Sequence, residues 1–402
     1  MSPRKSIHDD FDAIVDFFPP ESTPDFVYGL VKVTYQRTER GWRRAKAAPL
    51  YHDIRLPDTK PFWAPGSDFW PTKVQTDVAV RGSAHSPNGR PAPSCRVRVQ
   101  VGQHSKGINV YGDRQVLWNN LGRVQFGPAE PFTKMPIVWE RAYGGWDRRV
   151  PIGIDPMTVA DMSRLEFDHP GMYPRNPMGR GYLVVDAPCE GVLLPNLEDP
   201  RQPLTPETYV TRDPALWYRQ PLPACFEYTN AMMFHRLCWL GAGAWFHPPA
   251  GAELAEVRAG VLPPDYLSLR GMLVSAPQVL QEGAIGMVFD PLPAATPIVV
   301  EGMHPEIPRV EFALPTPPTV EFSIEGKVYP APTQLTNVLV EPGELRISMT
   351  YAARQEELPR VFIPGIHAKI PLALRIDRTH TVPYDCPPTL REQRKASAGA
   401  GS

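Results

Sequence analysis

The stretch Cys95-Arg-Val-Arg-Val-Gln-Val101 alternates strictly between two kinds of side chain. Its odd-numbered residues are apolar or a thiol, and its even-numbered residues are polar, so an extended chain would place the two kinds on opposite sides. This period of two is typical of an antiparallel strand with one apolar face and one polar face. The stretch therefore predicts a protein built on β-sheets.

The same period recurs along much of the chain, and proline limits what lies between the predicted strands. The 402 residues include 50 prolines, and a proline inside a helix costs about 3 kcal/mol. Short strands joined by turns therefore fit this composition better than a helical bundle. We expect Gly112-Asp-Arg114 to be the turn of a hairpin. The further predicted strands cover 27–35, 76–82, 108–111, 115–118, 285–289, 297–300, 309–314, 320–324, 335–340, 345–351, 361–363 and 370–376.

The predicted fold is mainly β, with antiparallel sandwich-like or barrel-like domains, long ordered loops rich in proline and glycine, and few short helices. Between 120 and 225, prolines, glycines and single aromatic residues replace the regular period, which indicates ordered loops packed on a sheet. We predict a β domain with these loops over 23–245, a second β-rich domain over 246–380, and a mobile polar tail over 381–402.

The N-terminal residues 1–22 have a different pattern. Ile7, Phe11, Ile14, Val15 and Phe18 fall at helical spacing, and two prolines follow. The spacing predicts a short acidic amphipathic helix. We expect it to pack on its own domain, and docking on a partner is the alternative.

The charges of the chain nearly cancel, since 42 basic residues face 43 acidic ones. This balance argues against binding to nucleic acid, which needs a basic face. The longest apolar stretch, 237–246, is about half of a membrane span, so we expect no membrane insertion. Five scattered cysteines, among them Cys225 and Cys238, show no zinc-site spacing, and the two named lie among apolar residues. We therefore expect reduced buried thiols, a cytoplasmic protein, and no cofactor or metal.

Two pairs of a tryptophan and a carboxylate are the clearest catalytic candidates. Trp139 precedes Glu140 and Trp146 precedes Asp147, and a glycoside hydrolase needs a ring platform beside two carboxylates. An arginine follows each acid, however, and a neighbouring cation keeps a carboxylate ionised rather than raising its pKa for acid catalysis. We favour salt-bridged structural loops, and a carbohydrate-active β-sandwich hydrolase using Glu140 and Asp147 is the alternative.

A succession of short motifs in the first half carries a resemblance to a known family. In order, the motifs are Ser67-Asp-Phe69 with Pro71 and Lys73; Thr76-Asp-Val78 with Gly82; Ala84-His-Ser-Pro87; Val101-Gly102 with Lys106; Tyr111-Gly-Asp-Arg114; Pro131-Phe132 and Met135-Pro136 with Trp139-Glu-Arg-Ala-Tyr-Gly-Gly145; Asn176-Pro-Met-Gly-Arg-Gly181; and Leu194-Pro-Asn-Leu-Glu198. This succession resembles the bacterial type VI secretion effector-adaptor family, a domain of unknown function found beside the VgrG spike and PAAR tip proteins. The resemblance covers about residues 25–240, and the β-rich remainder continues it.

The resemblance implies a cytoplasmic accessory protein that is not itself toxic, binds an effector toxin and helps to load it onto the VgrG spike or PAAR tip. It implies no catalytic residues. The residue types of the loops fit this role, because rigid aromatic rings and arginines are enriched at the energetic centres of interfaces. The predicted partner-binding residues are Arg114, Trp139, Arg141, Tyr143, Gly144, Gly145, Trp146, Arg180 and Tyr182.

Two alternatives to this prediction remain open. Each of these residues, taken singly, can instead be a turn glycine or an internal brace of the loops. The whole chain can also be a structural subunit of the secretion machine rather than a transient adaptor.

Overall fold

The computed structural model describes residues 10–18, 26–50, 68, 73–147, 149–150, 171–173, 175–184, 191–209, 214–229, 281–355 and 372–384. These residues form mainly β-structure, which confirms the predicted fold class. Within them no helix combines the length and the apolar character that crossing a bilayer requires. The helices described are α1 (Pro206–Tyr209) and the 3-10 helices η1 (Pro87–Gly89), η2 (Trp139–Arg141), η4 (Pro214–Arg219) and η8 (Pro342–Glu344).

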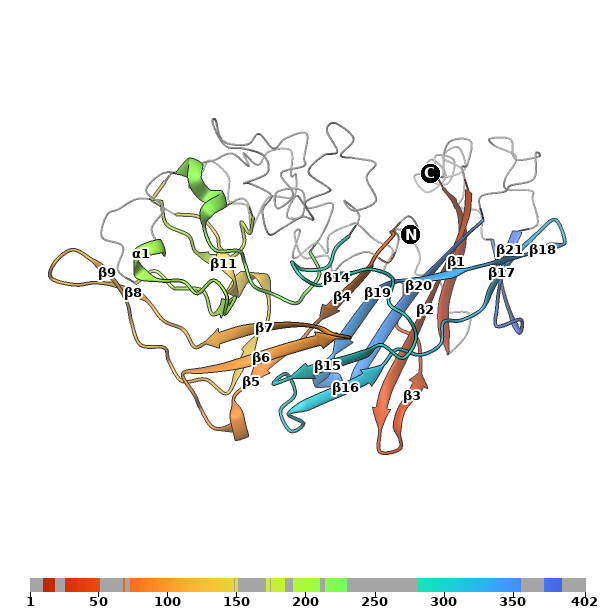
Figure 1. Ribbon diagram of the computed structural model, residues 1–402, viewed down its shortest axis with the longest axis horizontal. Helices are drawn as coiled ribbons and strands as arrows, with labels where there is room; N and C mark the ends of the chain where they lie inside the picture. The colour runs from red at the N-terminus through yellow and green to blue at the C-terminus, as the bar shows by residue number, and fades with distance from the viewer. Residues whose placement is uncertain are drawn as a thin grey trace, which may run out of the picture.

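The largest sheet has seven strands, drawn from both ends of the chain (Figure 1). Its strand order is β1-β2-β20-β19-β4-β14, and β3 pairs with the second half of β2, beyond β1. The β19–β4 pair is parallel, and the other pairs are antiparallel. The strands are β1 (Phe11–Phe18), β2 (Phe26–Thr38), β3 (Gly41–Ala45), β4 (Thr76–Val80), β14 (Val288–Phe289), β19 (Thr333–Glu341) and β20 (Arg346–Gln355).

Two smaller sheets pack beside it, and three short pairs of strands complete the fold. The five-stranded sheet has the order β13 (Leu197–Glu198), β7 (His104–Tyr111), β6 (Ser94–Val101), β15 (Pro297–Glu301) and β16 (Arg309–Ala313). The four-stranded sheet has the order β18 (Lys327–Ala331), β17 (Val320–Ile324), β21 (Leu372–Ile376) and β22 (His380–Pro383). The short pairs are β5 (Ser83–His85) with β10 (Lys134–Pro136), β8 (Val116–Trp118) with β9 (Val124–Phe126), and β11 (Tyr143–Gly144) with β12 (Arg180–Gly181).

One continuous hydrophobic core joins the three large sheets. The odd-numbered face of β2 packs against both smaller sheets: Tyr35 meets Phe312 of β16 with ring centroids 5.6 Å apart, and Gly29 meets Leu374 of β21. A Cβ at Gly29 would lie 2.5 Å from a Leu374 methyl group, so glycine permits this close approach. Figure 1 shows β8, β9, β11 and α1 at one end of the molecule and β17, β18 and β21 at the other.

The prediction of an N-terminal helix is wrong for residues 11–18, which form β1 along the edge of β2. The strand is buried on both faces: Phe11 and Val15 face the main core, and Ile14 packs with Tyr28 and Leu30 of β2 on the other side. A strand covered on both faces needs apolar residues at odd and even positions. That requirement produced the spacing that resembled a helix.

The sheets do not follow the predicted boundary at 245/246. The seven-stranded and five-stranded sheets each combine strands from before and after it, for example β6 with β15.

The predicted hairpin at 112–114 is also wrong, because β7 pairs with β6 and β13 while β8 pairs with β9. The predicted tail begins inside β22, and residues 385–402 and the strand expected at 361–363 lie outside the described residues.

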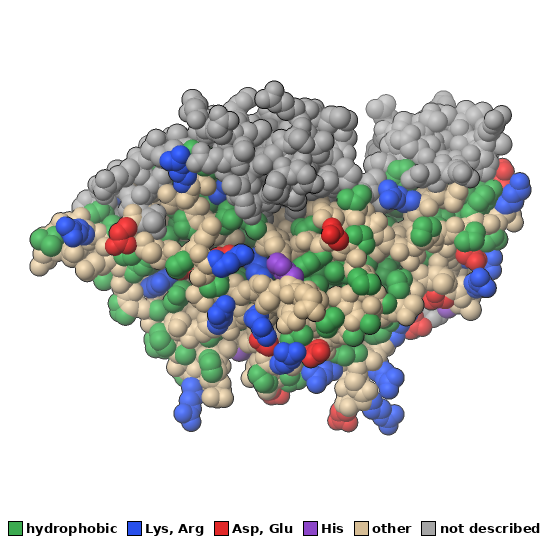
Figure 2. All heavy atoms as spheres, in the orientation of Figure 1, with side chains coloured by type: hydrophobic (Ala, Val, Ile, Leu, Met, Phe, Trp, Pro, Cys, Tyr) green, Lys and Arg blue, Asp and Glu red, His purple; other side chains and the backbone are tan. Residues whose placement is uncertain are grey.

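The charged side chains of the face shown in Figure 2 are of mixed sign, with Lys and Arg interspersed with Asp and Glu. Several charged side chains of the sheets form ion pairs along or between strands. Arg98 binds Glu301 with two hydrogen bonds of 2.8 Å between β6 and β15, and Arg309 also contacts Glu301 at 3.0 Å. The even-numbered side chains of the opening stretch therefore lie on a polar face, as the alternation predicts.

Candidate functional site

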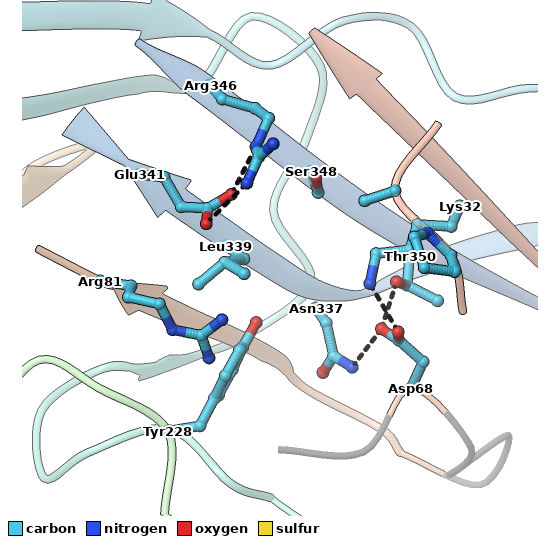
Figure 3. A pocket seen from close by; sticks show the side chains of 12 residues that line it. Lys32, Asp68, Arg81, Tyr228, Asn337, Leu339, Glu341, Arg346, Ser348 and Thr350 are labelled. Carbon is cyan, nitrogen blue, oxygen red and sulfur yellow. Dashed lines mark hydrogen bonds and ion pairs between the residues drawn. The ribbon is translucent and has the colours of Figure 1, made fainter. Parts of the chain in front are cut away.

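The seven-stranded sheet carries a polar row on the face opposite its apolar core (Figure 3). Asp77 of β4, Asn337 of β19, Thr350 of β20 and Lys32 of β2 pair in register across four adjacent strands. All four are buried, with 8% exposure or less. A cavity of about 160 Å³ lies over this face. The alternation of these strands predicted a polar face, but not that the face is covered.

Asp68 lies over the row and accepts three hydrogen bonds from it. Oδ2 accepts from Lys32 Nζ at 2.6 Å, and Oδ1 accepts from Thr350 Oγ1 at 2.6 Å and from Asn337 Nδ2 at 3.4 Å. Figure 3 shows these side chains converging on the carboxylate. Asp68 stands in the first of the sequence motifs, and it joins three neighbouring strands of the sheet.

Lys73 forms the second buried centre of this face. Its Nζ lies 2.8 Å from Asp77 Oδ2 and 3.1 Å from Glu282 Oε2, and it donates to Asn337 Oδ1 at 2.8 Å. Burial lowers the pKa of Lys73, but Asp77 and Glu282 raise it by more, so it lies above its ordinary value. The ammonium group is therefore held charged between two carboxylates.

This network holds segments of the chain together through hydrogen bonds and ion pairs. The hydroxyl groups of this face are engaged, since Thr350 donates to Asp68 and the hydroxyl of Ser348 shares a 3.0 Å hydrogen bond with that of Thr34. A nucleophilic hydroxyl needs an adjacent general base, often a histidine, to take its proton. Arg346 and Glu341 form a bidentate pair in the wall of the cavity, and Arg81, also in the wall, forms another with Glu227. The face anchors the segment before β4 and the segment that contains Glu282.

Lys106 of β7 anchors two further segments. Its Nζ donates to the carbonyl oxygens of Cys225 at 2.9 Å and Ile285 at 2.6 Å, and it lies 5.6 Å from the ring centre of Phe226. Burial lowers the pKa of Lys106 to about 8. Burial also raises the pKa of the Cys225 thiol to about 12, as expected for a thiol among apolar residues.

The later sequence motifs meet in the loop region around Asn196. Its backbone N–H donates to the Arg141 carbonyl at 2.9 Å, and its Nδ2 donates to the Tyr111 carbonyl at 3.0 Å and to Asp113 Oδ1 at 2.9 Å. Arg141 and Arg180 also reach Asp113 Oδ1, at 3.3 and 3.4 Å. Four motifs separated in the sequence therefore share one polar cluster.

Arg114 forms a buried pair with Glu198 at the side of this cluster. Its guanidinium lies 4.0 Å from the ring centre of Tyr111. Burial raises the pKa of Glu198 above its ordinary value, although Arg114 and the backbone N–H of Leu204 act in the opposite direction. Arg114 thus has an internal bracing role.

The predicted glycines are needed for close packing of two motifs. Gly144 has φ +148° and a Cβ there would lie 2.1 Å from the carbonyl oxygen of Asn176; at Gly145, with φ +84°, it would lie 2.4 Å from that of Gly179. Asn176 Nδ2 donates to the carbonyls of Trp139 at 2.8 Å and Tyr143 at 3.1 Å. Residues 139–145 and 176–181 are locked together, and β11 pairs with β12 in parallel.

Three of the predicted aromatic residues are buried in this region. The ring of Tyr173 lies 5.1 Å from that of Tyr143 and 5.3 Å from that of Tyr182. Trp139 donates from Nε1 to the Tyr228 carbonyl at 3.0 Å. Tyr143, Tyr182 and Trp139 are 7% exposed or less, whereas Trp146 is half-buried. Tyr143 and Tyr182 belong to the core of the loop region and Trp139 to the main core, so a contact with a partner remains a prediction for them.

A cavity of about 690 Å³ opens among these loops, a size common for ligand sites. Five of the predicted residues line it, namely Gly144, Gly145, Trp146, Arg180 and Tyr182. Apolar side chains, including Met178 and Leu193, and the backbones of three further glycines complete the wall. The structure thus brings these five together at a cavity and places Arg114, Trp139, Arg141 and Tyr143 around it.

Glu140 and Asp147 line the same cavity, but Asp147 does not suit acid catalysis. Its Oδ1 and Oδ2 accept from Arg149 Nε at 2.8 Å and Nη2 at 2.7 Å, and the backbone N–H groups of Arg149 and Val184 donate to it. Burial raises the pKa of Asp147, but these bonds lower it by more, so it lies below the ordinary value. Sequence reasoning expected a cation beside this acid; the cation is Arg149, two residues on.

Among the described residues, no group of three or more His, Cys, Asp or Glu side chains is arranged to hold a metal ion. Sequence reasoning did not identify the residues of the polar row as one buried network. Asp68, Lys73 and Asp77 stand in the quoted motifs. Lys32, Glu282 and Asn337 stand in none of them, and their only sign in the sequence is that each is a polar residue within or beside an apolar stretch.

Comparison with known proteins places the chain in a family. No curated protein and no solved structure matches it. Residues 25–352 match the family described as "Uncharacterized protein conserved in bacteria (DUF2169)". This range includes β2 to β19 and most of β20, and with them both the polar row and the loop cavity. Since the match spans well over half of the chain, the protein belongs to this conserved bacterial family.

Proposed function

We propose that this protein is an effector adaptor of a type VI secretion system, which binds a cargo effector in the bacterial cytoplasm and loads it onto the VgrG spike or the PAAR tip protein. The ordered sequence motifs motivate the identity of the system. The observation that supports binding is that motifs far apart in the chain surround one cavity of about 690 Å³. Glycine backbone and apolar side chains make up much of its wall, which suits noncovalent binding of a polypeptide.

Loading and release set limits on the interface. The complex must survive delivery to the spike and come apart at or before firing. An interface of standard size, about 1,600 Å² in total, fits this requirement better than an obligate one of several thousand. The loop cavity and the surface around it are the place where we expect part of that interface.

Co-purification tests the proposal. The tagged protein is co-expressed with the untagged effector encoded beside it, and we expect the effector to be retained with the wild type. Trp146→Ala is expected to weaken retention, because Trp146 lines the cavity and is half-buried. Trp42→Ala on β3, also half-buried but on the seven-stranded sheet, is the matched control. An effector that is not retained by the wild type contradicts the proposal.

The hydrolase alternative is weakened by the surroundings of Asp147. Arg149 holds the pKa of Asp147 below its ordinary value, which does not suit a general acid, and it occupies both carboxylate oxygens, which does not suit a nucleophile or base. The third candidate, a structural subunit of the secretion machine, predicts a fixed stoichiometry in spike particles sheared from cells. Recovery of this protein in every particle would favour that role over a transient adaptor.

A further inference from the structure

The described residues expose five large apolar side chains, and two of them, Leu117 and Leu193, lie on neighbouring segments at the loop cavity. Leu193 lines the cavity, and it faces Gln115 across an antiparallel bridge. Leu117 lies two residues beyond Gln115 on β8, so Leu117 and Leu193 are on the same side of this small sheet. Leu117 and Leu193 are 40% and 39% exposed, whereas Val116, the residue before Leu117, is fully buried on the other side. We call Leu117 and Leu193 the leucine face.

Arg180 supplies a cation to the same cavity. Its Nη1 lies 3.4 Å from Asp113 Oδ1, and the same oxygen also serves Arg141 at 3.3 Å. Its Nε donates to a carbonyl, that of Glu140, at 3.1 Å. Burial and the charge of Arg141 lower the pKa of Arg180, and Asp113 and Glu140 do not fully offset them. Two guanidinium groups thus share one carboxylate oxygen at long distances, with side chains that are 23% and 26% exposed.

The other ion pair of the cavity is complete. Arg149 binds both oxygens of Asp147 at 2.7 and 2.8 Å, which satisfies that carboxylate. A further anionic group entering the cavity therefore gains most at Arg180, where a charge-assisted hydrogen bond is incomplete. The glycine backbones at 144, 145, 179, 181 and 191 leave room for a second main chain to approach closely.

We infer that the loop cavity binds an extended segment of a partner polypeptide in which an Asp or Glu side chain pairs with Arg180 and neighbouring apolar side chains cover the leucine face. The occupant follows from charge complementarity at Arg180 and from the continuity of the leucine face with the cavity wall. The inference rests on the proposed function and adds the chemistry of the segment that the adaptor recognises.

A displayed library of random peptides tests this inference with the purified full chain. The wild type is expected to select peptides that carry an acidic residue close to Leu, Ile, Val or Phe. Arg180→Gln is expected to weaken a selected peptide by at least about tenfold, which corresponds to about 1.4 kcal/mol, because it removes a charge-assisted hydrogen bond. Arg180→Gln should also abolish the preference for acidic residues, whereas Leu193→Ser should weaken binding and keep that preference.

Two matched controls lie far from the cavity in the fold. Arg309→Gln removes an arginine of β16 that is 48% exposed and paired with Glu301 and Glu311, and Val328→Ser removes a valine of β18 that is 45% exposed. Both are expected to bind the selected peptides like the wild type. Thermal unfolding verifies that each variant is folded before its binding is compared.

The inference is overturned if the wild type selects no acidic and apolar peptides, or if the selected peptides bind Arg180→Gln and Leu193→Ser as tightly as they bind the wild type. Its failure is distinguishable from failure of the proposed function. An effector retained equally by the wild type and by both variants refutes the inference and leaves the adaptor function in place. An effector not retained by the wild type refutes the adaptor function itself.

Discussion

Replacing Lys106 by methionine is expected to change how the stability of this protein depends on pH. The Lys106 amine is buried with two carbonyl partners, and burial lowers its pKa from the ordinary 10.5 to about 8. Between these two pH values the unfolded chain holds a proton on Lys106 that the folded chain has released. The free energy of unfolding therefore rises with pH in this window through Lys106, because the cost of burying its charge is relieved.

The magnitude follows from the difference in pKa. A difference of about 2.5 units corresponds to about 3 kcal/mol over the full window, and linkage gives about 2 kcal/mol between pH 7 and about 9.5. Methionine carries no proton at this position. The stability of Lys106→Met relative to the wild type is therefore expected to be greatest near pH 7 and to fall by about 2 kcal/mol by pH 9.5.

Urea unfolding followed by tryptophan fluorescence at several pH values measures this difference. Other groups that titrate in the same range are common to both proteins and cancel in the comparison. Lys134→Met, at an exposed lysine of β10, is the control for removing a lysine in general. A difference between Lys106→Met and the wild type that stays constant with pH, or that changes in the opposite direction, refutes the reasoning.

Three further predictions concern the loop cavity and the polar row. Gly144→Ala is expected to lower the unfolding free energy by several kcal/mol, because the new Cβ would lie 2.1 Å from a carbonyl oxygen. Gly343 has open space around it, so Gly343→Ala should change the unfolding free energy by less than about 1 kcal/mol. Thermal unfolding compares the two variants. Asp147→Asn removes the carboxylate that pairs with Arg149. Because the pKa of Asp147 is lowered in the fold, the carboxylate stabilises the folded protein above the unfolded pKa of about 4, and this stabilisation is lost as pH falls through the folded pKa. The unfolding free energies of Asp147→Asn and the wild type should therefore converge in acid. Lys73→Met leaves two buried carboxylates without their cation and is expected to cost about 3–5 kcal/mol in urea; an unchanged midpoint would contradict the role given to this ion group.

Local alternation was sufficient to predict most strands, because a strand with one apolar face leaves a period of two in the sequence. The even residues of β6 and β20 illustrate the limit of that signal. Those of β6 include Arg98, in a half-exposed ion pair, whereas Ser348 and Thr350 of β20 are buried. The same alternation of polar and apolar residues therefore accompanies a solvent-exposed face in one sheet and a buried face in the other.

Which strands pair with one another could not be predicted from local sequence patterns, for a different reason. β6 pairs with β15 across about half of the chain, and no short-range feature of either strand specifies the other. The loop site was partly predictable, since its arginines, glycines and aromatic rings stand in recognisable motifs. Whether a ring such as Tyr182 faces a partner or its own core depends on residues contributed by other motifs, such as Tyr173.

The position of β2 inside the largest sheet has a consequence for folding during synthesis on the ribosome. Thr34 of β2 bonds to Ser348 of β20, a residue that is synthesised 314 positions later. Until then the long apolar strand has one edge without its final neighbour, a condition that favours pairing with other chains. Synthesis of β20, more than local propensity, therefore decides when this sheet can close, and slow folding is expected of such distant contacts.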